Sequence, residues 1–244
     1  MILHDRVVLI TGGAKRIGRE LALGMAKRGA RVAFSYRSSA PDARALLKAL
    51  ERQGTAAVAV RADLSRDADV RHLIGRVAKR FGRLDVLINS AANFDRVPFG
   101  RLTERDWDHA LDANLKGSFL CALHASRVMR RRGGGKIINF ADWAAVRPYR
   151  DYLPYCVSKA GVIGLTKALA KELAPEIQVN AIAPGPILPP PDMSAAARRR
   201  VARRVPLKRW GSPQDIVNTA LFLIEGTDFM TGSTVFVDGG QLIA

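Results

Sequence analysis

The chain has few residues that could build a metal centre or a disulfide framework. Its two cysteines, Cys121 and Cys156, stand alone, and its four histidines are scattered along the sequence. Zinc sites use cysteine or histidine ligands at short spacings, and a disulfide framework needs cysteines in pairs. We therefore expect neither a metal ion nor a disulfide.

Long apolar runs are also missing. No run reaches the ~20 residues needed to span a bilayer. The first residues include Asp5 and Arg6 rather than the apolar core of a signal peptide. The sequence therefore predicts a cytoplasmic protein that has no membrane partner.

Acidic residues are in the minority, with 22 Asp and Glu against 39 Lys and Arg, which gives a net charge of +17. Such an excess can indicate nucleic-acid binding, and Arg198 to Arg200 with Arg203 and Arg204 could line a phosphate track. However, the charge is spread over many predicted helices, with no RNP-like aromatic pattern and no recognition helix. We expect no nucleic-acid partner; a non-catalytic nucleic-acid-binding or regulatory protein is the remote alternative.

The chain does contain an alternation of strand and helix patterns. Strand-like apolar runs occur near Arg6, Arg31, Ala56, Leu84, Lys136, Ile177 and Thr234. Helical patterns separate these runs, which predicts an α/β fold: a doubly wound, Rossmann-like parallel sheet with helices on both faces. A length of 244 residues with 48% hydrophobic residues fits a single domain over 1–244.

An irregular, proline-rich segment interrupts this alternation near the C-terminus. The sequence PGPILPPPDM is followed by a helical pattern from about Ser194 to Arg204. We expect this part of the chain, about residues 186–208, to form a mobile lid over a substrate pocket. Its arginines would suit an anionic substrate such as a folate tail.

A glycine-rich turn follows the first predicted strand. Gly12, Gly13 and Gly18 lie between the run RVVLIT and a helical pattern. A strand, a glycine turn and a helix N-terminus together form a site for a pyrophosphate, because the backbone can approach the ligand closely. The turn departs from G-x-G-x-x-G, so a role in packing alone is the alternative.

Tyr155 and Lys159 lie four residues apart in a helical pattern, with Asp142 before them. Side chains at i and i+4 share a helix face, so the lysine ammonium can lower the pKa of the phenol from its usual ~10. A phenol tuned in this way can donate a proton near neutral pH. The three residues predict a proton-delivery site, the alternative being an ordinary surface pair on a helix.

Taken together, the motifs resemble the short-chain dehydrogenase/reductase family. They are TGGAKRIG, NSAA from Asn89, Asn114 in DANLKGSF, Tyr155-x-x-x-Lys159, PGP from Pro184 and the terminal VDGG. The resemblance spans almost the whole chain and implies about seven strands, a homotetramer, and Asn114, Tyr155, Lys159 and Asp142 as the catalytic set. It implies cofactor contacts at Gly12, Lys15, Arg16, Ile17, Gly18, Tyr36, Arg37, Ser38, Asp63, Leu64, Asn89, Ala91, Tyr155, Lys159, Pro184, Gly185 and Ile187.

The end of the second predicted strand indicates which cofactor is used. An NAD enzyme carries Asp or Glu here to bind the ribose 2′-hydroxyl, and AFSYRSS has neither. Arg37 and Ser38 instead offer a cation and a hydroxyl to a 2′-phosphate, which Lys15 or Arg16 could also reach. We therefore expect NADPH, the alternative being that these arginines are ordinary surface residues.

Within the family, the chain resembles the pteridine reductase branch at three positions. Arg16 replaces a usual glycine, Asp142 replaces a usual serine, and Phe94 falls where a ring stacks on a pterin. Ala92 and Asn93 depart from that branch. A solvated charge, a helix cap and a loop anchor are the respective alternatives for Arg16, Asp142 and Phe94.

The substrate expectation follows from Asp142. A carboxylate would repel the oxyanion that develops when a ketone is reduced, whereas a carboxylic acid can help to protonate the nitrogen of a C=N bond. We therefore expect NADPH-dependent reduction of a pterin or folate-like substrate, bound by Arg16, Phe94, Asp142 and Tyr155. Reduction of a 3-oxoacyl thioester, such as one on acyl carrier protein, or of another carbonyl is the alternative.

Overall fold

A computed structural model describes residues 1–244 and centres on one parallel β-sheet. Its seven strands lie in the order β3-β2-β1-β4-β5-β6-β7, and every neighbouring pair is parallel. The strands are β1 (Val7–Thr11), β2 (Arg31–Tyr36), β3 (Ala57–Arg61), β4 (Val86–Asn89), β5 (Gly135–Phe140), β6 (Ile177–Pro184) and β7 (Thr234–Val237). The predicted doubly wound α/β fold is confirmed.

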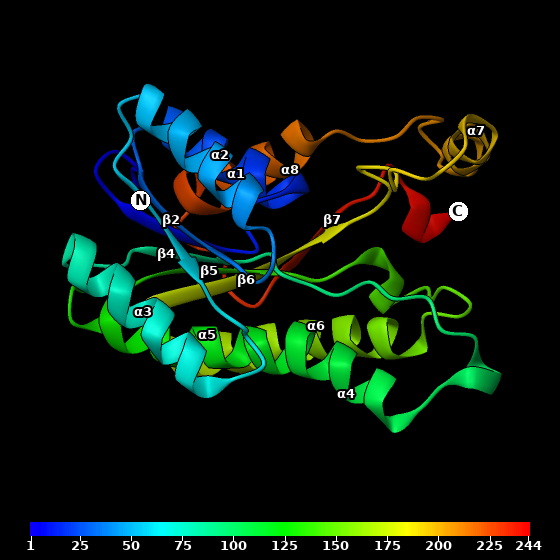
Figure 1. Cartoon of the computed structure of the whole chain (residues 1–244), viewed down its shortest axis with the longest axis horizontal. Helices are drawn as coiled ribbons and strands as arrows, with labels where there is room; N and C mark the ends of the chain where they lie inside the picture. Colours follow the sequence, from blue (N-terminus) through cyan, green and yellow to red (C-terminus); the bar gives the residue numbers. More distant parts are fainter.

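Helices cover both faces of this sheet. They are α1 (Arg16–Lys27), α2 (Ala40–Arg52), α3 (Asp67–Phe81), α4 (Glu104–Leu111), α5 (Gly117–Arg130), α6 (Leu153–Leu173), α7 (Ala195–Arg204) and α8 (Pro213–Leu221). Figure 1 shows α1, α2 and α8 on one face, and α3, α5 and α6 on the other. None of these helices combines the length and the apolar character needed to cross a membrane.

The core consists of two main apolar layers, one on each side of the sheet, and β1 contributes side chains to both layers. Val8 and Ile10 belong to the layer beneath α1, α2 and α8, whereas Val7 and Leu9 belong to the layer beneath α3, α5 and α6. Alternate residues of a strand point to opposite faces, so a strand buried on both faces must be apolar throughout. This explains the continuous run VVLIT.

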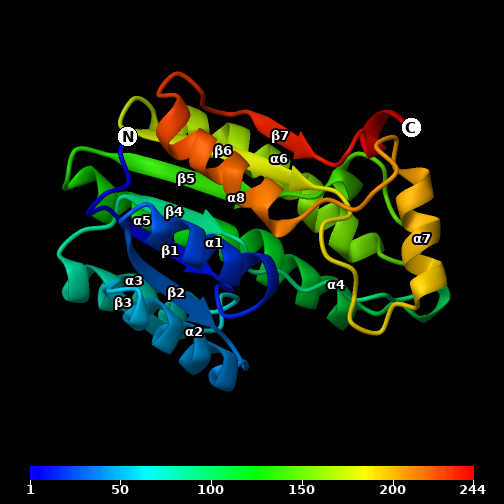
Figure 2. The ribbon, with the colours of Figure 1, turned by 90° about the horizontal axis from the view of Figure 1, so that it is seen from above.

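The strand order fixes where a ligand can bind. β1 pairs with β2 on one side and with β4 on the other, so the connections leave the centre of the sheet in opposite directions. A crevice forms at such a switch point, at the carboxyl ends of the strands. Figure 2 shows these ends facing the same way, with α7 lying beyond them.

A π-helical turn, Asp112–Lys116, joins α4 to α5. Asn114 lies in this turn and is completely buried. Turns of this kind bulge out of the regular α-helical ladder and often occur at functional sites. The resemblance to the family placed Asn114 in the catalytic set, and the bulge is the local structure that surrounds it.

Candidate active site

A cavity of about 790 Å³ opens at the carboxyl ends of the strands. Its wall contains all but two of the predicted site residues: Gly12, Lys15, Arg16, Ile17, Gly18, Tyr36, Arg37, Ser38, Asp63, Leu64, Ala91, Phe94, Asp142, Tyr155, Lys159, Pro184, Gly185 and Ile187. These residues come from strand ends and loops distributed over most of the chain. The fold brings them together because parallel strands end at one edge.

The glycine turn at one end of the cavity has no room for side chains. A Cβ on Gly18 would lie 2.4 Å from the Gly12 carbonyl oxygen, and a Cβ on Gly13 would lie 2.5 Å from Cβ of Phe34. Gly12 also has a φ of +64°, which L-residues rarely adopt. The backbone is therefore exposed beside the N-terminus of α1, as a pyrophosphate site requires.

Arg16 spans the groove next to this turn. It has a φ of +50°, and its guanidinium donates a hydrogen bond of 2.9 Å to the Leu188 carbonyl, in the segment that follows β6. Lys15 forms an ion pair of 3.1 Å with Asp42. Arg37 and Ser38 line the cavity at the end of β2, where the chain carries no acidic residue. This end of the cavity is therefore basic and fits a phosphate.

Tyr155 and Asp142 meet deeper in the cavity. The Tyr155 hydroxyl donates a hydrogen bond of 2.7 Å to Oδ2 of Asp142, and Oδ1 accepts one of 2.8 Å from the Ala144 amide. Asp142 thereby also caps the short helical turn Trp143–Ala145. The capping role considered as an alternative in the sequence analysis therefore exists alongside the contact with the tyrosine.

Burial shifts both groups toward their neutral forms. It raises the pKa of the Asp142 carboxyl above its ordinary value, although the hydrogen bonds from Tyr155 and Ala144 and the charge of Lys159 oppose the shift. Burial, together with the Asp142 charge, raises the pKa of Tyr155 well above its ordinary value. A carboxyl that accepts a hydrogen bond from the phenol stabilises the protonated phenol.

The expectation that Lys159 lowers the pKa of Tyr155 is wrong for this arrangement. Lys159 Nζ donates a hydrogen bond of 2.6 Å to the Phe140 carbonyl and lies 5.8 Å from the centre of the Tyr155 ring. Burial lowers the pKa of Lys159 to about 8, and the Asp142 charge opposes that shift. Burial of the phenol and, after it, the nearby Asp142 carboxyl set the direction of the Tyr155 pKa shift.

Asn89 and Asn114 are the two predicted site residues outside the cavity wall. Asn89 is buried, and its amide donates hydrogen bonds to Oδ1 of Asn139 and to the Ser118 carbonyl. The Asn114 side chain donates to the Asn93 carbonyl at 3.1 Å and accepts from the Asn93 amide at 2.7 Å. Both asparagines support the wall from behind, and Asn114 fixes the backbone immediately before Phe94.

Phe94 belongs to an aromatic cluster that the sequence analysis did not identify. It stacks on Tyr152 with 4.5 Å between ring centroids, and it meets the Tyr155 ring edge-on at 4.6 Å. Tyr149 contacts both Phe94 and Trp143. The recurring aromatic residues of DWAAVRPYRDYLPY were the available signal, but their spacing alone does not show which rings face a cavity.

Four further residues line the cavity on the side of α7: Met193, Val201, Arg204 and Trp210. The sequence analysis expected a lid in this region but did not single out these side chains. Their placement depends on the path of the irregular segment between β6 and α7, which carries no periodic pattern. α7 therefore contributes directly to the wall on the substrate side.

Known proteins resemble this chain over nearly its full length. A family model described as "Enoyl-(Acyl carrier protein) reductase" matches residues 12–241. A 3-oxoacyl-[acyl-carrier-protein] reductase of Staphylococcus epidermidis is 36% identical, with 97% of this chain and 99% of that protein covered.

Solved structures agree with the fold. An actinorhodin polyketide ketoreductase with NADPH is 30% identical, with a TM-score of 0.92 over 98% of both chains. A levodione reductase is 31% identical, with a TM-score of 0.93 over 99% of both chains. Two structures this similar bear the names of different substrates, so the fold alone does not select a substrate.

Proposed function

This chain belongs to the short-chain dehydrogenase/reductase family of NAD(P)-dependent oxidoreductases, and we propose that it reduces the carbonyl of a 3-oxoacyl thioester with NADPH. The observation that carries the proposal is the Tyr155 hydroxyl, held at 2.7 Å from Asp142 in the cavity wall with Lys159 nearby. The reductase named for its action on an acyl carrier protein substrate, at 36% identity, supports this substrate class.

NADPH fits the basic end of the cavity. The turn at Gly12 and Gly18 accepts a pyrophosphate, and Arg37, Ser38 and Lys15 are suited to hold a ribose 2′-phosphate. NADPH also appears in the name of the related ketoreductase structure. When bound, NADPH supplies the hydride.

The residues of the chain would then supply the proton and stabilise the negative charge that develops on the substrate oxygen. Tyr155 donates its proton to the substrate oxygen as the C–O bond becomes single. In its protonated form, which burial favours, Asp142 donates a second hydrogen bond to the same oxygen. A neutral acid removes the repulsion on which the expectation of C=N reduction depended, so Asp142 does not exclude a carbonyl substrate.

A second candidate substrate is a flat heterocycle with a C=N bond, such as a pterin. Two observations favour it: Asp142 stands beside Tyr155, and Phe94 lies edge-on to the Tyr155 ring within an aromatic cluster. Aromatic side chains provide apolar faces on which a planar ring stacks. The comparisons favour the thioester instead.

We also propose that residues 1–244 form one domain in which the segment at about 186–208 acts as a substrate lid. Met193, Val201 and Arg204 of this segment line the cavity, and the Arg16 guanidinium binds the segment at Leu188. Closure of the segment would exclude water from the reacting atoms.

The test follows NADPH oxidation with an acetoacetyl thioester and, in parallel, with dihydrobiopterin. We expect turnover of the thioester, and in Tyr155→Phe a loss of about 10²–10⁴-fold in kcat, which is the range for general-acid catalysis. The dissociation constant for NADPH should change little. Turnover of dihydrobiopterin alone would favour the second candidate, and a Tyr155→Phe variant with nearly normal kcat would refute the role of the tyrosine.

A further inference from the structure

We propose that Arg204 selects substrates with an anionic group at the end remote from the reacting bond. The inference rests on the proposed function, because it concerns the substrate half of the same cavity. It adds a specificity-determining residue that is distant from Asp142, Tyr155 and Lys159. The phosphate of a phosphopantetheine thioester and the carboxylates of a folate tail share the required chemistry.

The first observation is where Arg204 lies on its helix. α7 carries arginines at positions 198, 199, 200, 203 and 204, but only Arg204 among them lines the cavity, together with Val201 of the same helix. At 3.6 residues per turn, Val201 and Arg204 share a face, whereas Arg199 lies on the opposite side. Figure 2 shows α7 beyond the carboxyl ends of the strands, the end of the sheet at which the cavity opens.

The second observation is that nothing in the protein neutralises this charge. Arg198 donates to the Met193 carbonyl, but the guanidinium groups of Arg199, Arg200, Arg203 and Arg204 have no hydrogen-bond or ion-pair partner. α7 has no acidic residue of its own. An unpaired cation beside an apolar wall is a site for an anion.

The third observation concerns the acidic residues of the cavity. Asp63 and Asp142 are the only two in its wall. Asp63 follows β3, beside the basic end of the cavity, where it accepts hydrogen bonds from Ser65. Asp142 lies beside Tyr155. The mouth next to α7 therefore offers Arg204 without a competing carboxylate, and an anionic substrate tail would complete the charge balance there.

The experiment compares substrates that share a reacting group but differ in the charge of the tail. One pair is acetoacetyl coenzyme A and the neutral acetoacetyl thioester of N-acetylcysteamine. The other pair is dihydrofolate, which carries glutamate carboxylates, and dihydrobiopterin, which does not. The variants are Arg204→Ala and Arg204→Glu, with Arg199→Ala as the matched control on the opposite face of α7.

We expect Arg204→Ala to raise KM for the anionic member of the active pair by about three- to fivefold, as for a solvent-screened ion pair. Arg204→Glu should raise it by about tenfold or more, because attraction becomes repulsion. kcat, and KM for the neutral member, should stay within about twofold. Arg199→Ala should change KM for neither member of the pair. Equal effects on charged and neutral members, or no effect of Arg204→Glu, would overturn the proposal.

A binding measurement separates this inference from the proposed function. Trp143 and Trp210 line the cavity, so their fluorescence reports ligand binding even when no turnover occurs. If the wild-type protein reduces none of the four compounds, the proposed function fails. Weaker binding of coenzyme A thioester or dihydrofolate to Arg204→Glu, but not to Arg199→Ala, would still support the assignment of Arg204, and unchanged binding would refute it.

Discussion

The side chain of Asp142 has two hydrogen-bond partners, and the two set its structural and chemical roles. The Ala144 amide makes it a helix cap, and the Tyr155 hydroxyl makes it part of the proposed proton-donating pair. Its protonation state then controls the second role. The neutral acid donates to a substrate oxygen, whereas the carboxylate holds the phenolic proton and repels an oxyanion.

This control predicts a pH dependence. Burial raises the pKa of Asp142, so the protonated form persists above the ordinary carboxyl value of 3.8 and is lost as the pH rises through the raised pKa. For a carbonyl substrate, kcat/KM should therefore fall as the pH rises through that value. In Asp142→Asn the amide donates at every pH, so this fall should be absent from the pH profile of kcat/KM.

The profile of Asp142→Asn also identifies other titrating groups. Lys159, with a pKa lowered to about 8, would produce a separate change that the substitution at position 142 leaves in place. If kcat/KM of Asp142→Asn still falls over the same pH range as that of the wild-type protein, another group causes the fall. The Asp142 mechanism would then be rejected.

Sequence reasoning at the residue scale relies on motifs whose position in space is fixed by local elements. The glycine turn and the Tyr155/Lys159 pair came from local spacing on known elements, and both line the cavity. It failed for the direction of the Tyr155 pKa, because that depends on where the Lys159 ammonium points. Arg204 was one of several equivalent arginines until the path of the chain placed it.

At the scale of elements, strands were more predictable than connections. All seven predicted strand regions match β1 to β7. The central strands are buried on both faces and need continuous apolar runs, whereas the edge strands β3 and β7 are only partly buried. The helical pattern at about Ser194 to Arg204 corresponds to α7, Ala195–Arg204. The packing of helix on helix could not be predicted, since it depends on side chains from distant parts of the chain.

The contact between α1 and α8 is one such packing detail. A Cβ on Gly24 of α1 would lie 2.5 Å from Cγ1 of Val217 in α8. Gly24→Ala should gain about 1 kcal/mol of helix propensity but lose about 1–3 kcal/mol to overpacking, so we expect a net decrease in the free energy of unfolding. Urea unfolding measures this change.

Two further variants test the cause. Val217→Ala removes the clashing methyl groups, so the double variant Gly24→Ala/Val217→Ala should be more stable than the sum of the single effects predicts. Gly75 in α3 has no atom within 4 Å of a built Cβ. Gly75→Ala should therefore stabilise by up to about 1 kcal/mol. Strict additivity in the double variant would show that Val217 does not cause the loss.

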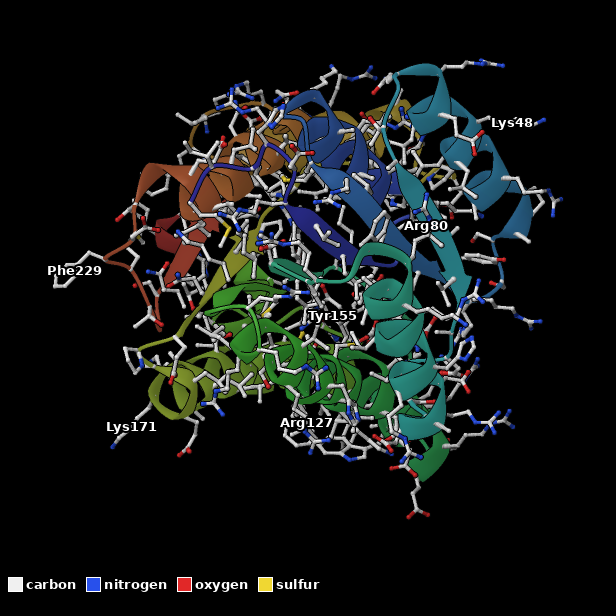
Figure 3. The ribbon with its side chains drawn as sticks, turned by 90° about the vertical axis from the view of Figure 1, so that its left-hand side faces the viewer. Lys48, Arg80, Arg127, Tyr155, Lys171 and Phe229 are labelled. Atoms are coloured by element: carbon white, nitrogen blue, oxygen red, sulfur yellow. The ribbon has the colours of Figure 1, made fainter.

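At the scale of the whole molecule, charge and apolar surface are distributed differently. Figure 3 shows Lys48 and Lys171 extending outward on opposite sides of the molecule, whereas Tyr155 lies in the interior of the view. The net charge of +17 is thus carried by side chains on many sides. Such a charge opposes self-association at low ionic strength.

Apolar side chains nevertheless remain exposed on particular elements. Phe119 on α5 and Val157 on α6 are each 41% exposed, and Phe229, before β7, is 100% exposed and projects from the surface in Figure 3. Exposed apolar groups gathered on neighbouring elements mark interaction surfaces. They support the predicted homotetramer, and we propose that α5, α6 and the C-terminal strand form its contact surfaces.

Substitution on α5 tests this assembly. Phe119→Lys places a charge where an apolar contact is expected, so light scattering should show a smaller species than for the wild-type protein. Ile2→Lys is the matched control, because Ile2 is also exposed, at 75%, but lies at the N-terminus. Association driven by apolar burial should strengthen as salt screens the charge of +17, whereas assembly through ion pairs should weaken. A monomeric wild-type protein at all salt concentrations would contradict the prediction, and dissociation caused equally by Ile2→Lys would place the interface elsewhere.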